Sequence, residues 1–187
     1  MITIKKAMGQ EESMFKFFLR WMDSWSLTDT LDKQHIPFQE SSKDTKIQWF
    51  RILPFILLHI ACLAVFWVGV SWFAIAFMLF FYFIRMFAIT AFFHRYLSHK
   101  TFQTSRPIQF FFVLIGTMSA QRGPLWWAAH HRYHHRFTDT DHDPHSSTHG
   151  FWYSHIGWFL NEQNFCTRKE VIKDWLKFPE IVWLDRF

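Results

Sequence analysis

The feature that most constrains this chain is a run of 33 residues, from Ile52 to Ile84, that contains no Asp, Glu, Lys or Arg. A largely apolar stretch continues this run to Phe93, which makes 42 residues in all, and the hydrophobicity is weakest around residues 68–72. A membrane-spanning helix needs about 20 apolar residues, so this length accommodates two. We therefore predict a transmembrane helical hairpin over residues 51–93, in preference to one long tilted helix or a buried pair of soluble helices.

The net charge of +5 arises in the middle of the chain and predicts how the hairpin is oriented. Residues 94–136 carry six basic and no acidic side chains, and Lys43, Lys46 and Arg51 precede the first span. Because cytoplasmic loops are enriched in Lys and Arg, both ends of the hairpin are expected on the cytoplasmic side. The basic zone suits anionic lipid head groups. We expect a multi-pass integral membrane protein and no nucleic-acid partner.

The remaining residues form three segments on the cytoplasmic side. Residues 1–50 are predicted to be an N-terminal cytosolic segment and linker, and residues 94–160 form a His-rich region. Within that region, residues 107–120 form an apolar stretch of 14 residues, which is too short for a full span and predicts an interfacial helix. Residues 161–187 are expected to be the start of a truncated cytosolic region. The predicted fold is an all-α membrane protein: a transmembrane helical hairpin, an amphipathic interfacial helix and cytosolic His-box helices.

Two histidine motifs flank the interfacial helix and predict a metal site. His94 and His99 form an HxxxxH pattern, and His131, His134 and His135 form an HxxHH pattern. On an α-helix, residues three and four apart are neighbours, so the three imidazoles of the second motif are expected on one face. The first two histidines are five residues apart, so a turn at a helix end is needed to bring their rings together. Neutral imidazoles suit Fe, Zn, Cu or Ni.

Around these motifs the sequence resembles the membrane fatty acyl desaturases of the acyl-CoA Δ9 type, particularly their bacterial members. The resemblance covers Arg85–Leu160 and is carried by the segments ITAFFHRYLSHKTFQTSRP, AQRGPLWWAAHHRYHHRFTDTDHDPHS and GFWYSHIGWFL. It implies an oxidoreductase that uses O2 and a di-iron centre to introduce a double bond into an acyl chain. The family's iron ligands correspond here to His94, His99, His131, His134 and His135.

The resemblance also implies roles for the residues around these ligands. Asp141, Asp143 and His145 match the family's acidic stretch, whose side chains orient the ligand imidazoles. Gln121 and Trp127 match residues that shape a kinked acyl tunnel. Such a tunnel makes physical sense, because an unactivated methylene offers no handle for acid–base chemistry and must be held, away from solvent, against an oxidant.

The resemblance implies partners as well. The substrate is a fatty acyl chain, carried as a CoA thioester or in a lipid, and the sequence leaves this choice and the regiospecificity open. The chain contains no GxGxxG or other nucleotide motif, so electrons are expected from a separate carrier, such as cytochrome b5 or a ferredoxin with its reductase. The basic surface of residues 94–136 is expected to dock this acidic carrier.

One part of the family pattern is missing from these 187 residues. Desaturases of this type carry a second HxxHH motif after another pair of transmembrane helices, whereas no His follows His155 here. We therefore interpret the chain as the N-terminal part of a desaturase and expect it to be incomplete and inactive on its own. The alternatives are another membrane hydroxylase with His boxes and a degenerate membrane protein that binds metal.

Overall fold

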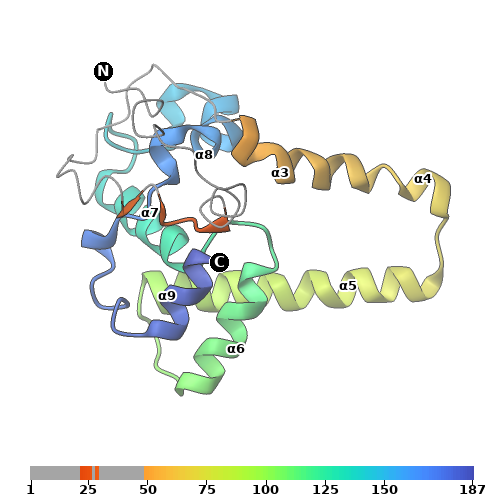
Figure 1. Ribbon diagram of the computed structural model, residues 1–187, viewed down its shortest axis with the longest axis horizontal. Coiled ribbons are helices and arrows are strands. Elements are labelled where there is room, and N and C mark those ends of the chain that lie inside the picture. The colour runs from red at the N-terminus through yellow and green to blue at the C-terminus, as the bar shows by residue number, and fades with distance from the viewer. Residues whose placement is uncertain (1–21, 27, 30–48) are drawn as a thin grey trace, which may run out of the picture.

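The computed structural model describes residues 22–26, 28–29 and 49–187, and the regular elements in this part of the chain are helices (Figure 1). The prediction of an all-helical fold is confirmed for these residues. Most of the predicted segment 1–50 lies outside them. The α-helices are α3 (Trp49–Cys62), α4 (Val65–Val68), α5 (Trp72–Phe87), α6 (Arg106–Thr117), α7 (Pro124–Phe137), α8 (Trp158–Leu160) and α9 (Pro179–Arg186). Two π-helices, η2 (Ala88–Ser98) and η4 (Tyr153–Gly157), and three short 3-10 helices, η3 (Ser147–His149), η5 (Glu162–Phe165) and η6 (Lys169–Val171), complete the described elements.

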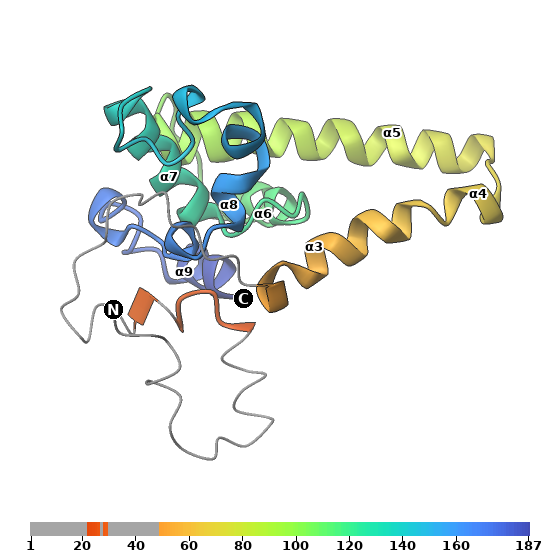
Figure 2. The same cartoon turned by 90° about the horizontal axis from the view of Figure 1, so that it is seen from above.

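Helices α3, α4 and α5 form an arm (Figures 1 and 2). The arm projects from the other described residues, mainly 88–187, which we call the body. The chain runs outward through α3 and α4 and reverses between Val68 and Trp72, where the sequence predicts the turn. Gly69 adopts a φ of 73° in this turn, a conformation that favours glycine. Ser71 then starts α5 as its N-cap, because its hydroxyl accepts a hydrogen bond from the N–H of Ala74 at 3.1 Å.

The surface of the arm is apolar and exposed. Neither α4 nor α5 contains a buried residue, and Trp67, for example, is 81% exposed. Among the described residues, the helix Trp72–Ser98 is long and apolar enough to cross a membrane, whereas the apolar helix Ile52–Val68 is shorter. An exposed apolar surface of this extent marks a contact with a membrane or with another protein.

The core of the body surrounds η2, which continues α5. Phe93 and Leu97 are fully buried there, together with Leu125 of α7. α6 covers most of the predicted interfacial segment, and it buries one face through Gln109, Val113 and Gly116. Its other face is apolar and exposed, at positions that include Ile108, Phe111 and Leu114.

Residues 161–187 complete this body, a packing that the sequence did not predict. Ile172 and Ile181 are fully buried, and α9 packs against α6 and α7. Two acidic residues of the segment pair with basic residues elsewhere in the body: Asp174 lies 2.8 Å from Lys100, and Glu180 lies 2.7 Å from Arg106. These ion pairs and the buried side chains attach residues 161–187 to the rest of the body.

Asp185 is a buried carboxylate at the centre of this packing. Its Oδ1 accepts hydrogen bonds from the backbone N–H groups of Leu125 and Trp126, at 2.6 and 2.8 Å, and its Oδ2 accepts from the Trp25 indole and the Thr167 hydroxyl. The carboxylate thus satisfies two free N–H groups at the start of α7 and lies favourably at the positive end of the helix dipole. Burial nevertheless raises the pKa of Asp185, which these hydrogen bonds oppose.

Gly116→Ala is expected to lower the free energy of unfolding by about 1–3 kcal/mol. A Cβ at this position would lie 2.4 Å from Cε1 of Phe93, whose ring is fully buried and has no free space to move into. Denaturant unfolding in detergent, followed by circular dichroism, measures the loss. Leu114→Ala, at an exposed position of the same helix, is the control, and equal losses in the two variants would contradict this packing.

Candidate metal centre

The HxxxxH motif lies at the end of the π-helix η2, with His94 inside the helix and His99 as its C-cap, and this helix type accounts for the spacing. η2 extends the helix beyond Phe93, where the sequence predicts the hairpin to end, as far as Ser98. Hydrogen bonds in a π-helix join residues five apart, and the N–H of His99 donates such a bond to the carbonyl of His94 at 3.1 Å. The two imidazoles consequently lie on the same side, with ring centroids 4.6 Å apart.

His131 and His135 of α7 meet this first pair. They are one α-helical turn apart, with their Nε2 atoms separated by 3.0 Å, and the Nε2 of His131 lies 3.1 Å from that of His99. One ligand nitrogen from each of His94, His99, His131 and His135 lies within 4.8 Å of the other three. We call these residues the four-histidine cluster. Several imidazole nitrogens that converge in this way form the donor set of a transition-metal site.

The surroundings of His99 and His131 favour the neutral form of these two imidazoles. Burial, followed by the neighbouring imidazoles of His135, His94 and His99, lowers the pKa of His131 to about 3. Burial and the neighbouring His94 and His135 also lower the pKa of His99. A protonated imidazole has no lone pair for a metal, so these histidines are in the metal-binding form at neutral pH.

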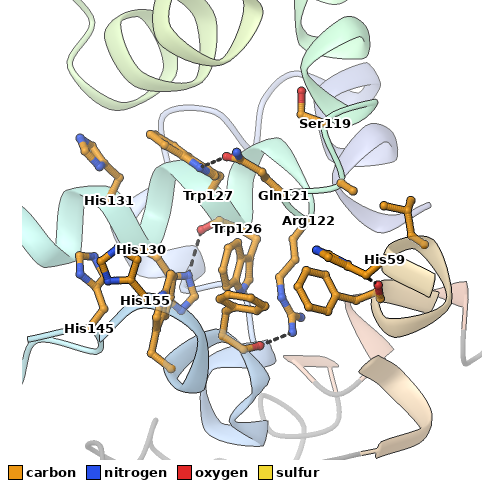
Figure 3. A pocket seen from close by; sticks show the side chains of 15 residues that line it. His59, Ser119, Gln121, Arg122, Trp126, Trp127, His130, His131, His145 and His155 are labelled. Carbon is orange, nitrogen blue, oxygen red and sulfur yellow. Dashed lines mark hydrogen bonds between the residues drawn. The ribbon is translucent and has the colours of Figure 1, made fainter. Parts of the chain in front are cut away.

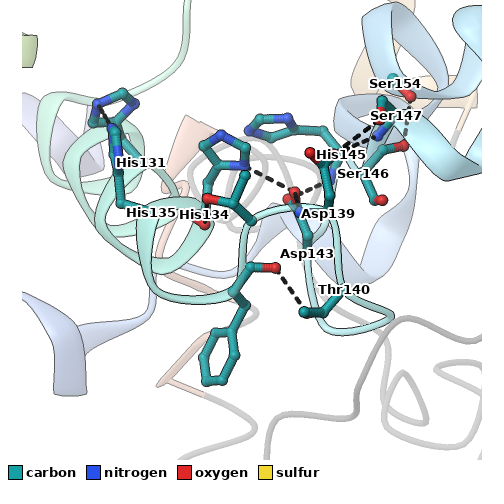
Figure 4. A network of polar contacts seen from close by, with 12 residues as sticks. His131, His134, His135, Asp139, Thr140, Asp143, His145, Ser146, Ser147 and Ser154 are labelled. Atoms are coloured by element: carbon teal, nitrogen blue, oxygen red, sulfur yellow. Dashed lines mark hydrogen bonds and ion pairs between the residues drawn. The ribbon is translucent and has the colours of Figure 1, made fainter.

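His134 points away from this cluster and joins a second group, shown in Figure 4. The sequence predicts all three HxxHH imidazoles on one face, but consecutive α-helical positions differ by about 100° and the structure separates His134 from His135. The Nδ1–H of His134 donates to Oδ2 of Asp143 at 2.9 Å, which leaves Nε2 available for a metal. His134, Asp143 and His145 bring their ligand atoms within 4.8 Å of one another.

Asp143 is fully buried and holds the loop that follows α7. It also accepts hydrogen bonds from the backbone N–H groups of Asp139 and His145, at 3.0 and 3.1 Å. Although burial opposes ionisation, the bonds from His134 and from these N–H groups lower the pKa of Asp143. Asp141, the remaining member of the predicted acidic group, is exposed and belongs to neither histidine group among the described residues.

Gln121 and Trp127 lie beside the four-histidine cluster, at the wall of a cavity of 470 Å³ (Figure 3). The indole N–H of Trp127 donates to Oε1 of Gln121 at 3.1 Å, and its ring stacks on His131 with centroids 4.8 Å apart. His131 and His145 also line the cavity, so both histidine groups reach it. Its size and its largely aromatic wall are those of a small-molecule site.

Two residues of this region were not predicted from the sequence as parts of the centre. His130 is 2% exposed, lines the cavity and donates from Nδ1 to the carbonyl of Trp126 at 2.9 Å. Arg132 contacts residues from two other segments of the chain, as described below. The only available signal for His130 was its position four residues after Trp126, which places their rings in contact.

An exposed apolar helix that leads into two histidine-rich groups defines the class of protein: a helical, membrane-associated protein with a candidate metal centre.

No family model matches the chain. It is, however, 43% identical over 122 residues to the sn-1 stearoyl-lipid 9-desaturase of Anabaena variabilis, which covers 64% of this chain and 45% of that protein. It is 36% identical to an acyl-CoA 5-desaturase of Anemone leveillei, with 84% of this chain and 52% of the relative covered. An sn-2 palmitoyl-lipid 9-desaturase from a Nostoc strain is 33% identical, over 79% of this chain and 54% of the relative.

The chain is therefore a homologue of the acyl-lipid and acyl-CoA desaturases, a family of oxidoreductases, and the resemblance predicted from its histidine motifs is confirmed. The chain spans about half the length of the curated relatives it matches.

Proposed function

We propose that this chain carries two histidine boxes of an O2-dependent fatty acyl desaturase and that the four-histidine cluster holds one of its irons. The observation that carries the proposal is the convergence of four imidazole nitrogens within 4.8 Å, beside an aromatic cavity. The donor set fits the metal, because neutral imidazoles are ligands for iron. His134, with Asp143 and His145 beside it, is proposed to contribute to the second iron site.

Iron, when bound, would supply the oxidising chemistry that removal of hydrogen from a methylene requires. The chain's own residues hold the metal, orient the substrate and exclude water. Trp127 forms the part of the cavity wall next to His131, and its hydrogen bond to Gln121 fixes the plane of the indole. An acyl chain bound in the cavity would lie against this wall, so one part of it is held at the metal while solvent is kept out.

We further propose that the arm crosses the membrane as a two-span hairpin, with both histidine groups on the cytoplasmic side. The helix Trp72–Ser98 has the length of a full span, and Ile52–Val68 is near the lower limit for one. The basic residues Lys100 and Arg106 follow this second helix and Arg95 lies in its last turn, which favours the cytoplasmic side for the body. The exposed apolar face of α6 would then lie at the membrane interface.

The substrate and the electron donor follow from the same reasoning. The relatives are named for acyl groups in lipids and in CoA thioesters, so we propose a fatty acyl chain in one of these carriers. The proposed donor is a small acidic electron carrier, such as cytochrome b5 or a ferredoxin. Of the predicted basic surface, Arg95 and Arg136 are exposed, whereas Lys100, Arg106 and Arg132 form ion pairs with residues of 161–187.

The test is expression of the chain in membranes that lack a desaturase, alone and together with the part of the Anabaena variabilis relative that the chain does not match. Isotopically labelled O2 and a reductase are supplied, and the fatty acids are analysed. We expect iron but no product from the chain alone, and new double bonds from the combination, with the label recovered in water. Labelled oxygen in the fatty acid would instead identify a hydroxylase. One metal ion per chain and no oxygen consumption in the combination would favour a metal-binding membrane protein.

A further inference from the structure

We propose that Arg132 positions the two histidine boxes relative to each other, so that metal affinity depends on a side chain that is not itself a ligand. The inference rests on the proposed function in one respect, namely that the four-histidine cluster binds a metal ion. Arg132 lies within the HxxHH motif, between His131 and His134, but its side chain leaves the histidine face.

The guanidinium of Arg132 holds the end of η2. Its Nε donates to the carbonyl of Ser98 at 3.0 Å, and its Nη2 donates to the carbonyl of Leu97. Ser98 immediately precedes His99, so this contact acts on the second ligand of the first box. Arg132 also directly follows His131, a ligand of the second box, in the chain. One side chain therefore ties the two boxes together.

A guanidinium suits this position for two physical reasons. The last carbonyls of a helix have no partner within it, and a cation near them interacts favourably with the helix dipole. Arg also presents five N–H donors in a rigid plane, whereas the ammonium of Lys is a single compact centre. The Leu97 carbonyl accepts a second hydrogen bond, from the indole N–H of Trp175 at 2.8 Å. Residues 161–187 thus help to fix the same helix end.

Asp174 fixes the guanidinium in turn. Nη1 and Nη2 donate to its two carboxylate oxygens at 2.8 and 3.1 Å, in the bidentate geometry that gives the strongest ion pairs. Nη1 also donates to the carbonyl of Val171 at 2.9 Å. The Arg132 side chain is only 16% exposed, and a charge this buried requires a partner. Although burial opposes it, hydrogen bonds from Arg132 and Lys100 lower the pKa of Asp174.

The ligand geometry makes the affinity sensitive to this arrangement. The Nε2 atoms of His99 and His131 are 3.1 Å apart, and they belong to different helices. Metal–ligand distances tolerate changes of only about 0.2 Å, so a small shift of η2 against α7 is enough to spoil the site.

Arg132→Lys in the 187-residue chain, purified in detergent and titrated with Co²⁺, tests the proposal. Loss of groups that orient ligands typically costs about 10- to 100-fold in metal affinity. We expect a loss in this range, a changed visible absorption spectrum of the bound Co²⁺ and an unchanged helical circular dichroism spectrum. Arg136→Lys, at an exposed position of the same helix, is the matched control and is expected to bind as the wild type does.

Wild-type Co²⁺ affinity and spectrum in a folded Arg132→Lys variant would overturn the proposal. So would a variant that is less stable but binds Co²⁺ with an unchanged spectrum, since that result assigns Arg132 a structural role alone. If Arg132→Lys does not fold, Asp174→Asn decides by the same criteria, because it removes the partner that fixes the guanidinium. Failure of the proposed function is a different result: a wild-type chain that binds no Co²⁺, or a His131→Ala variant that binds it fully.

Discussion

Replacing His131 with Ala is expected to abolish metal binding by the four-histidine cluster and, with it, any desaturation. Its Nε2 lies 3.1 Å from that of His99 and 3.0 Å from that of His135, so this imidazole links the two boxes. Loss of an outer partner of a ligand already costs about 10- to 100-fold in affinity, and loss of a ligand costs more. Metal content after dialysis and Co²⁺ titration of the purified chain measure the effect.

Two matched histidine variants complete this experiment. His149→Ala removes a histidine that lies outside both groups and contacts Tyr153, and it is expected to leave metal binding unchanged. His134→Ala is expected to spare the four-histidine cluster and to weaken only the second group. Full metal occupancy in the His131→Ala variant would show that the metal is held elsewhere in the chain.

Replacing Asp185 with Ala is expected to destabilise the body by about 4 kcal/mol or more. The substitution leaves four donors without their acceptor: the N–H groups of Leu125 and Trp126, the Trp25 indole and the Thr167 hydroxyl. Each buried donor without a partner costs about 1–3 kcal/mol. Because two of these donors begin α7, the variant is also expected to lose metal affinity. Chemical denaturation in detergent measures the stability.

Two controls accompany this second experiment: one replaces the buried carboxylate with an amide, and the other replaces a surface carboxylate of the same helix. Asp185→Asn keeps one carbonyl oxygen, so it is expected to fall between Ala and the wild type. Glu180→Gln weakens the ion pair with Arg106 on the surface of the same helix, which is worth about 1 kcal/mol or less. An Asp185→Ala variant with the denaturation midpoint of the wild type would refute this role for the buried carboxylate.

The parts of the fold that follow from local chemistry were predictable from the sequence. The run from Ile52 to Ile84 contains no charge, and the structure forms it into exposed apolar helices that break at Gly69. The spacing of His131 and His135 matches one α-helical turn, and their rings meet as that spacing requires. These features depend on residues close together in the chain, and local patterns record them.

The parts that depend on distant partners were not predictable. Asp185 meets Trp25 across 160 positions, and nothing in the short segment around Asp185 indicates such a partner. The sequence places Arg132 among the six basic residues of a predicted basic surface and does not indicate its carboxylate partner, Asp174, which lies 42 positions away. The π-helical form of residues 88–98 was also missed, since this conformation has no recognised pattern of residue types.

The π-helix has a consequence for anyone who wishes to build such a centre from scratch. Designed helical bundles use ideal α-helices, in which positions 94 and 99 would point in directions about 140° apart. Grafting the five histidines onto such a scaffold would therefore fail even if every side chain were copied. Likewise, a change that returned residues 94–99 to α-helical winding without shortening their five-residue spacing would turn His99 away from His94. A design of this centre must therefore specify the helical winding of the backbone as well as the identity of the ligands.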